Sequence, residues 1–193
     1  MTKNRLEAFS DGVLAIIITI MVLEFKVPND TTFESVLKLS HKFLSYILSF
    51  IYVGIYWNNH HHMLHTVKHV NGKILWANLH LLFWLSLIPF TTAWIGEHHF
   101  ASFPMMLYGI VLSMNAIAYF ILQYTIIANH GKDSVLSKAL GKDFKGKVSL
   151  VLYIIAVVLT KYYTIISGIL YIIVAIMWLI PDKRIEKILE EEK

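Results

Sequence analysis

The chain lacks cysteine and is poor in charged residues, and both shortages narrow the chemistry open to it. Its 193 residues include no cysteine, four prolines and nine glycines, and only 16% are charged. Without cysteine there is no disulfide framework, no thiolate metal site and no cysteine nucleophile. Soluble domains are about 25% charged, so a water-soluble globule of this composition is excluded. A disordered chain is excluded as well, because such chains are polar.

Hydrophobic residues take the place of the missing charge. They make up 56% of the chain, and the mean hydropathy is +0.59. This predicts an all-α integral membrane protein, since so much apolar surface needs hydrocarbon around it. No small-residue cleavage site follows the first apolar segment, which we therefore expect to stay in the mature protein.

Uncharged runs of about 20 residues predict the membrane-spanning helices. The first is unusual, because only twelve residues separate Asp11 from Glu24. A helix starting at residue 4 is long enough but carries Ser10 and Asp11 at membrane depth, so we expect the other helices to shelter it. Pro89 is a possible kink in the third span. The six predicted spans are residues 4–26, 35–66, 73–96, 101–130, 145–160 and 162–181, followed by a charged tail at 182–193.

The distribution of basic residues predicts the orientation of this bundle. With six spans, thirteen of the seventeen Lys and Arg residues lie on the side that holds both termini. The other side has only four, namely Lys26, Lys38, Lys42 and Lys161. The positive-inside rule then places both termini in the cytoplasm. For the same reason the net charge of +4 indicates cytoplasmic loops and no nucleic-acid partner. The sequence shows no internal repeat and no second domain, so residues 1–193 are expected to form one domain.

One face of the first helix is almost wholly apolar. Gly12, Ile16, Thr19 and Leu23 follow one another at helical spacing, with Ile20 beside them. Spacing alone favours an ordinary packed helix face, with the Thr19 hydroxyl bonded to a carbonyl of the preceding turn.

The residues just before that face carry a recognisable motif. Residues 5–13, RLEAFSDGV, match the pattern R-x-x-x-F-S-D-G-V, and the match continues through residues 15–24. This segment resembles the signature of the transmembrane protein 175 family of potassium channels, in its bacterial single-repeat form. Length, six spans and cytoplasmic termini are also similar. Like that family, the chain has no T-V-G-Y-G filter loop.

The resemblance implies a function that composition does not show. It implies a homotetramer in the cell membrane, with the first helix central and lining the pore. Carried over, the hydrophobic constriction or gate falls on Ile16, Ile20 and Leu23, and Thr19 supplies a ring of hydroxyls. The expected activity is a potassium-preferring cation channel without a cofactor. Its partners would be further copies of itself, the lipid bilayer, and potassium and related monovalent cations near Thr19.

The motif residues need partners, because buried charges are costly unless they are paired. In the resembled family the F-S-D residues tie the first helix to its neighbours, and we favour this role over a proton or ion relay. By topology, the candidate partners lie in the cytoplasmic halves of the second and third spans. The expected network consists of Arg5, Phe9, Ser10, Asp11, Trp57, His61, Asn78 and His80.

A dense run of histidines supports a rival class. His61, His65 and His69 are spaced four apart, as in helical metal sites. A metal-dependent membrane oxidoreductase would need several such groups on one membrane face, and His98-His99 falls on the opposite side. Common enzyme motifs are missing, so we expect no enzyme and no resident metal. A small secondary transporter is a further alternative, although the two related halves of such proteins are not visible here.

Overall fold

The computed structural model describes residues 2–131, 134–140 and 143–179, and within them every regular element is a helix. The predicted charged tail at 182–193 lies outside these residues. The helices are α1 (Lys3–Leu23), α2 (Phe33–Leu37), α3 (Ser40–His65), α4 (Gly72–Leu85), α5 (Ile88–Glu97), α6 (Ser102–His130), α7 (Val135–Leu140), α8 (Phe144–Leu159) and α9 (Thr164–Leu179).

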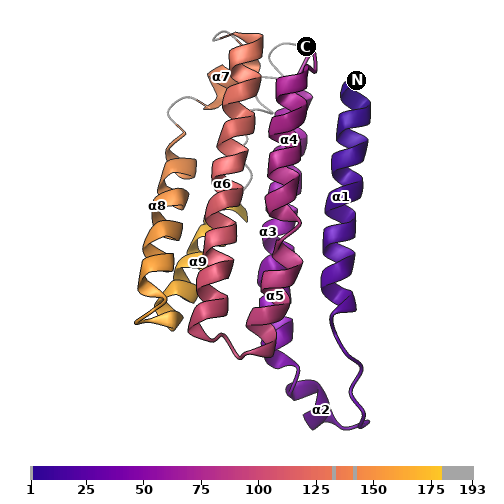
Figure 1. Ribbon diagram of the computed structural model, residues 1–193, viewed down its shortest axis with the longest axis vertical. Helices are drawn as coiled ribbons and strands as arrows, with labels where there is room; N and C mark the ends of the chain where they lie inside the picture. Colours follow the sequence, from indigo (N-terminus) through magenta and orange to yellow (C-terminus); the bar gives the residue numbers. More distant parts are fainter. Residues whose placement is uncertain (1, 132–133, 141–142, 180–193) are drawn as a thin grey trace.

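The long helices run side by side along one axis, and α1 lies at an edge of the bundle (Figure 1). It packs on α3, α4 and α5, whereas α8 and α9 pack against α6 and against each other on the far side. The short helices α2 and α7 lie at opposite ends (Figure 1). Among the described helices, the neighbours of α1 therefore all lie on one side of it.

Two of the predicted spans are interrupted. Residues 35–66 contain the end of α2, a break at Lys38 and Leu39, and then α3. Residues 73–96 are divided between α4 and α5, and Pro89 stands in the first turn of α5. Proline is tolerated there because the first turn of a helix has no internal acceptor for its missing N–H. Pro89 therefore marks the start of a new helical segment.

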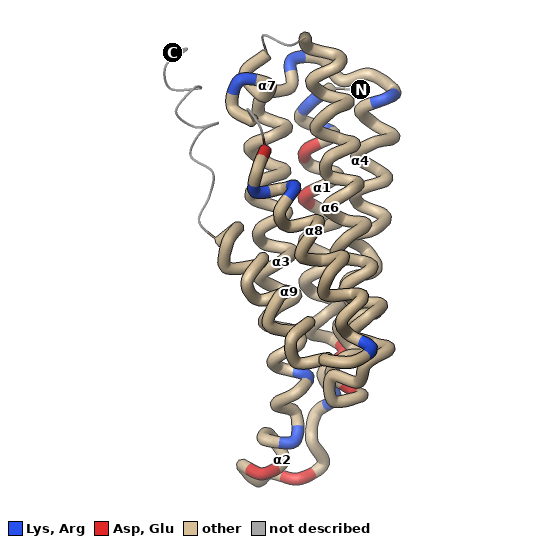
Figure 2. The backbone as a smooth tube through the Cα atoms, turned by 90° about the vertical axis from the view of Figure 1, so that its left-hand side faces the viewer, with Lys and Arg blue, Asp and Glu red and all other residues tan. Residues whose placement is uncertain are grey.

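Within the part of the chain that the structure describes, three helical stretches are long and apolar enough to cross a membrane. They are α1, the joined stretch Gly72–Glu97 and α6, while α9 is apolar but shorter. Charged residues gather at the two ends of the molecule, and most of the tube between them is free of charge (Figure 2). Lys and Arg are more numerous at the end with α7 and the N-terminus (Figure 2).

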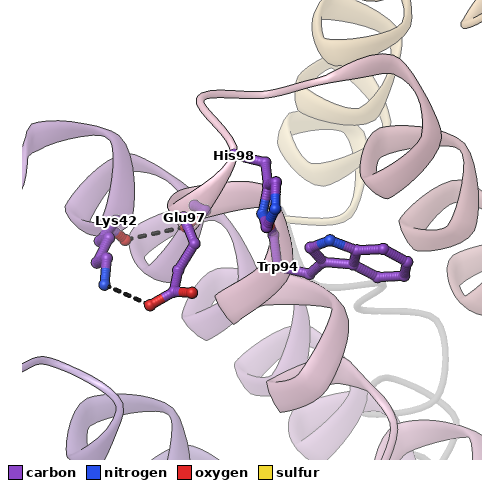
Figure 3. A network of polar contacts seen from close by, with 5 residues as sticks. Lys42, Trp94, Glu97 and His98 are labelled. Carbon is purple, nitrogen blue, oxygen red and sulfur yellow. Dashed lines mark hydrogen bonds and ion pairs between the residues drawn. The ribbon is translucent and has the colours of Figure 1, made fainter.

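At the opposite end, an ion pair joins α3 to α5. Lys42 Nζ lies 2.8 Å from Glu97 Oε1, and Trp94 and His98 lie close by on α5 and just beyond its end (Figure 3). The helices approach closely here, because a Cβ atom on Gly96 would lie only 2.9 Å from the Cα of Lys42. The absence of a side chain at position 96 thus allows α5 to dock beside α3.

Candidate functional site

Helix α1 has two unlike faces. Its buried residues follow one another at helical spacing and are Leu6, Ser10, Leu14, Ile17 and Met21. The opposite face is exposed although it is apolar. Ile16 is 57% exposed and Leu23 is 78% exposed, with Ile20 and Thr19 exposed between them. The residues expected to form a constriction therefore share the face of α1 that the other described helices leave exposed.

The single hydroxyl on this face is bonded within its own helix. Thr19 Oγ1 donates a hydrogen bond of 2.9 Å to the backbone carbonyl of Ile16, one turn earlier. Such a bond uses the hydroxyl proton and leaves the oxygen as an acceptor. The oxygen of Thr19 can thus still accept from a water or coordinate a cation.

The buried face of α1 is held by a chain of three polar side chains. Asn78 Nδ2 donates to Ser10 Oγ at 3.0 Å, and Ser10 Oγ donates in turn to the Leu6 carbonyl at 2.8 Å. Asn78 Oδ1 lies 2.7 Å from His60 Nε2. An amide oxygen only accepts, so His60 Nε2 is the donor. All three side chains are buried, and their hydrogen bonds join α1, α3 and α4.

His60 is a residue that the sequence reasoning missed. The sequence reasoning named its neighbour His61 as a partner of the motif residues. Successive residues of a helix point about 100° apart, so only one of these two histidines can face the bundle. His60 lies seven residues after the buried Val53 and four before the buried Leu64, whereas His61 is exposed. The helical spacing of the buried apolar residues of α3 was the sequence signal that distinguishes His60 from His61.

Asp11 belongs to a second, more exposed contact. Trp57 Nε1 donates to Asp11 Oδ1 at 3.0 Å, and both side chains are partly open to the surroundings. The ring of His61 lies roughly parallel to that of Trp57, with the centroids 6.4 Å apart. His61 therefore reaches the motif only through Trp57.

Arg5, Phe9 and His80, which were also predicted to belong to the network, do not take part in the contact between Trp57 and Asp11. The side chains of Arg5 and Phe9 are exposed, and Arg5 forms no hydrogen bond or ion pair within the described residues. His80 accepts a hydrogen bond of 3.0 Å from Trp84 Nε1 on its own helix. His80 is two residues after Asn78, so the two side chains point about 200° apart. His80 is therefore directed toward Trp84 and away from Asn78.

The histidine run does not form a recognisable metal centre. The ring of His61 lies 5.7 Å from that of His62 and 6.2 Å from that of His65, between centroids. Among the described residues, no group of three or more His, Cys, Asp or Glu side chains could hold a metal ion.

Comparisons with known proteins agree with the geometry. The family model described as Endosomal/lysosomal potassium channel TMEM175 matches residues 5–89. A potassium channel of Chryseobacterium sp. (strain P1-3) is 59% identical over 191 residues, or 99% of this chain and 100% of the relative. The endosomal/lysosomal proton channel TMEM175 of Homo sapiens is 36% identical over 96 residues, or 43% of this chain and 19% of that protein.

A solved structure extends the likeness to most of the chain. The crystal structure of a lysosomal potassium-selective channel TMEM175 homolog from Chamaesiphon minutus has a TM-score of 0.80 and 28% sequence identity. The match covers 93% of this chain and 97% of that one. All of these similar proteins are named as ion channels. The chain belongs to the TMEM175 family of potassium channels.

Proposed function

We propose that four copies of this chain assemble around their α1 helices to form a potassium-preferring pore. The observation that carries the proposal is the exposed apolar face of α1, with Ile16 and Leu23 more than half exposed. Exposed apolar patches mark sites of association. Lipid can also cover an apolar face. A helix that only faced lipid would not need a fixed rotation, whereas the buried Ser10–Asn78 hydrogen bond fixes the rotation of α1.

The constriction would be hydrophobic. Rings of Ile16, Ile20 and Leu23 side chains offer no carbonyl oxygens in place of an ion's hydration shell, so they close a pore by steric contact and by excluding water. When the rings widen, a partly hydrated cation passes and the Thr19 oxygens, or waters bound to them, act as ligands. Potassium loses its hydration water at lower cost than sodium does. The preference for potassium would therefore be modest.

The membrane arrangement is part of the proposal. The chain would form one domain that crosses the cell membrane six times. In this count, α2 and α3 together make one crossing, and so do α4 and α5. Both termini would be cytoplasmic, because the end with α7 and the N-terminus carries more Lys and Arg (Figure 2). Lysines near the far end would extend to the interface.

The pore can be tested by ion flux. We expect potassium-loaded liposomes containing the purified protein to release potassium faster than matched liposomes release sodium. Ile16→Ala or Leu23→Ala should increase flux and reduce the discrimination against sodium, because a smaller side chain widens the constriction. Ile154→Ala is the control, since Ile154 is 53% exposed on the distant helix α8. Equal fluxes in all variants would remove Ile16 and Leu23 from the pore.

The assembly can be tested by cross-linking. Because the chain has no cysteine, Leu23→Cys introduces a single thiol. We expect oxidation to link neighbouring copies through this position, whereas Ile154→Cys should stay monomeric on a denaturing gel. A Leu23→Cys protein that remains uncross-linked, at a measured mass of one chain in mild detergent, would refute the assembly.

The human relative suggests a second permeant ion. That protein is a proton channel, and 43% of this chain aligns with it. Reversal potentials measured in a proton gradient at constant potassium would separate the two ions.

A further inference from the structure

Glu24 continues the constriction face of α1 by one helical turn. Ile16, Ile20 and Glu24 follow one another at intervals of four residues, and Glu24 is the C-cap residue of the helix. The side chain is exposed, and it lines the same groove between α1 and α5 as Ile16 and Ile20 do. A carboxylate therefore stands next to the apolar rings at one end of the proposed pore.

Glu97 lines a cavity together with Glu24 and is ion-paired, whereas Glu24 has no ion pair within the described residues. Glu97 forms an ion pair with Lys42 (Figure 3), with 2.8 Å between Oε1 and Nζ, and Lys26 acts electrostatically on Glu97 as well. Glu24 forms no hydrogen bond or ion pair within the described residues. The negative charge of Glu24 is thus available to ions in the surrounding water.

The end of α1 adds to this charge. The last carbonyl groups of a helix have no partner within it, and they carry the negative end of the helix dipole. The final turn of α1 contains no basic residue that would offset them. Glu24 and the helix terminus therefore both favour a cation at the same place.

We infer that Glu24 recruits cations to the mouth of the pore and sets its conductance. This inference rests on the proposed function, because four copies of the chain around one pore would place four Glu24 carboxylates in a ring. Rings of acidic side chains at a pore mouth raise the local concentration of cations. Divalent cations, with twice the charge, bind such a ring more strongly than potassium does and compete with it.

The ionic strength of the solution provides the test. Surface charge acts over a Debye length of about 30 Å at 0.01 M salt but only about 3 Å at 1 M. In planar bilayers at low potassium chloride, we expect Glu24→Gln to lower single-channel conductance about threefold, while the two proteins converge near 1 M. Millimolar Mg²⁺ in both chambers should reduce the current of the parent protein and leave that of Glu24→Gln nearly unchanged.

A control and a charge reversal sharpen the result. Glu34 is an exposed carboxylate on α2, beyond the same end of α1 but off the constriction face, so Glu34→Gln should lower the conductance much less than Glu24→Gln does. Glu24→Lys should conduct less than Glu24→Gln. Equal conductance of Glu24→Gln and parent at low salt, or an equal loss in Glu34→Gln, would overturn the inference. Those outcomes leave the pore intact, whereas a parent protein that passes no current refutes the pore itself.

Discussion

The amide of Asn78 on α4 and the hydroxyl of Ser10 on α1 are joined by a hydrogen bond of 3.0 Å, and both side chains are completely buried. The same amide bonds to His60 of α3, so one side chain links three helices. In a hydrophobic interior each of these polar groups would be costly without its partner. The contact fixes the rotation of α1 and thereby decides which face of that helix remains exposed.

Asn78→Ala should destabilise the fold, because it leaves the His60 N–H without its acceptor and the Ser10 oxygen without the donor from Asn78. Such losses cost about 1–3 kcal/mol. We expect the midpoint of thermal unfolding, followed by size-exclusion chromatography, to fall by about 5 °C. Asn58→Ala is the control, since Asn58 is only partly buried. An unchanged midpoint for Asn78→Ala would show that the contact does not stabilise the bundle.

Trp57→Phe should weaken the attachment of Asp11 without changing selectivity. Phenylalanine keeps an aromatic ring beside His61 but lacks the N–H that reaches Asp11 Oδ1. The cost should be about 1 kcal/mol, seen as a lower yield of folded assembly. Asp11→Ala should likewise reduce yield more than selectivity. Trp76→Phe serves as the control, because Trp76 is 75% exposed. A well-folded Asp11→Ala protein with altered selectivity would instead place Asp11 on the ion path.

Gly109→Ala should disturb the packing of α6 against α8 and α9. A Cβ atom at this position would overlap the hydroxyl of Tyr171 and lie 2.8 Å from Val157 Cγ2. Tyr171 is buried and its hydroxyl donates to the Met105 carbonyl, so it cannot move freely. We expect a loss of about 2 kcal/mol in stability.

The matched control for that change is Gly54→Ala on α3. Nothing lies within 4 Å of the Cβ position there, so alanine should increase stability by about 0.5 kcal/mol through its better helix propensity. Equal melting temperatures for the two variants would contradict the packing argument.

His130→Ala should release the loop between α3 and α4. His130 Nε2 accepts from the backbone N–H groups of Lys68 and His69, at 3.1 and 3.3 Å, from the end of α6. Without this acceptor, the two amides should exchange their hydrogens faster with solvent. His69→Ala, which keeps its own backbone N–H, is the control. Unchanged exchange at residues 68 and 69 would show that the loop holds its shape without His130.

The sequence alone determined the class of protein and its family. The charge-poor, apolar composition and the uncharged runs of about 20 residues predict membrane-spanning helices, because a helix satisfies its backbone polar groups within the segment. The motif at residues 5–13 identified the family, and helical spacing placed Ile16 and Leu23 on one face of the first helix. Composition, a motif and helical spacing all depend on the order of residues along the chain, so the sequence by itself contains them.

Only the tertiary structure decided which polar residues meet. Whether His60 or His61 faces Asn78 depends on the rotation of α3 against α4, and that rotation results from packing along both helices. The rotation of α4 likewise turns Asn78 toward Ser10 and His80 toward Trp84. Rotating a helix about its axis changes which residues each of its side chains contacts, but it does not change the sequence. The sequence pattern by itself therefore cannot select the contacting pairs.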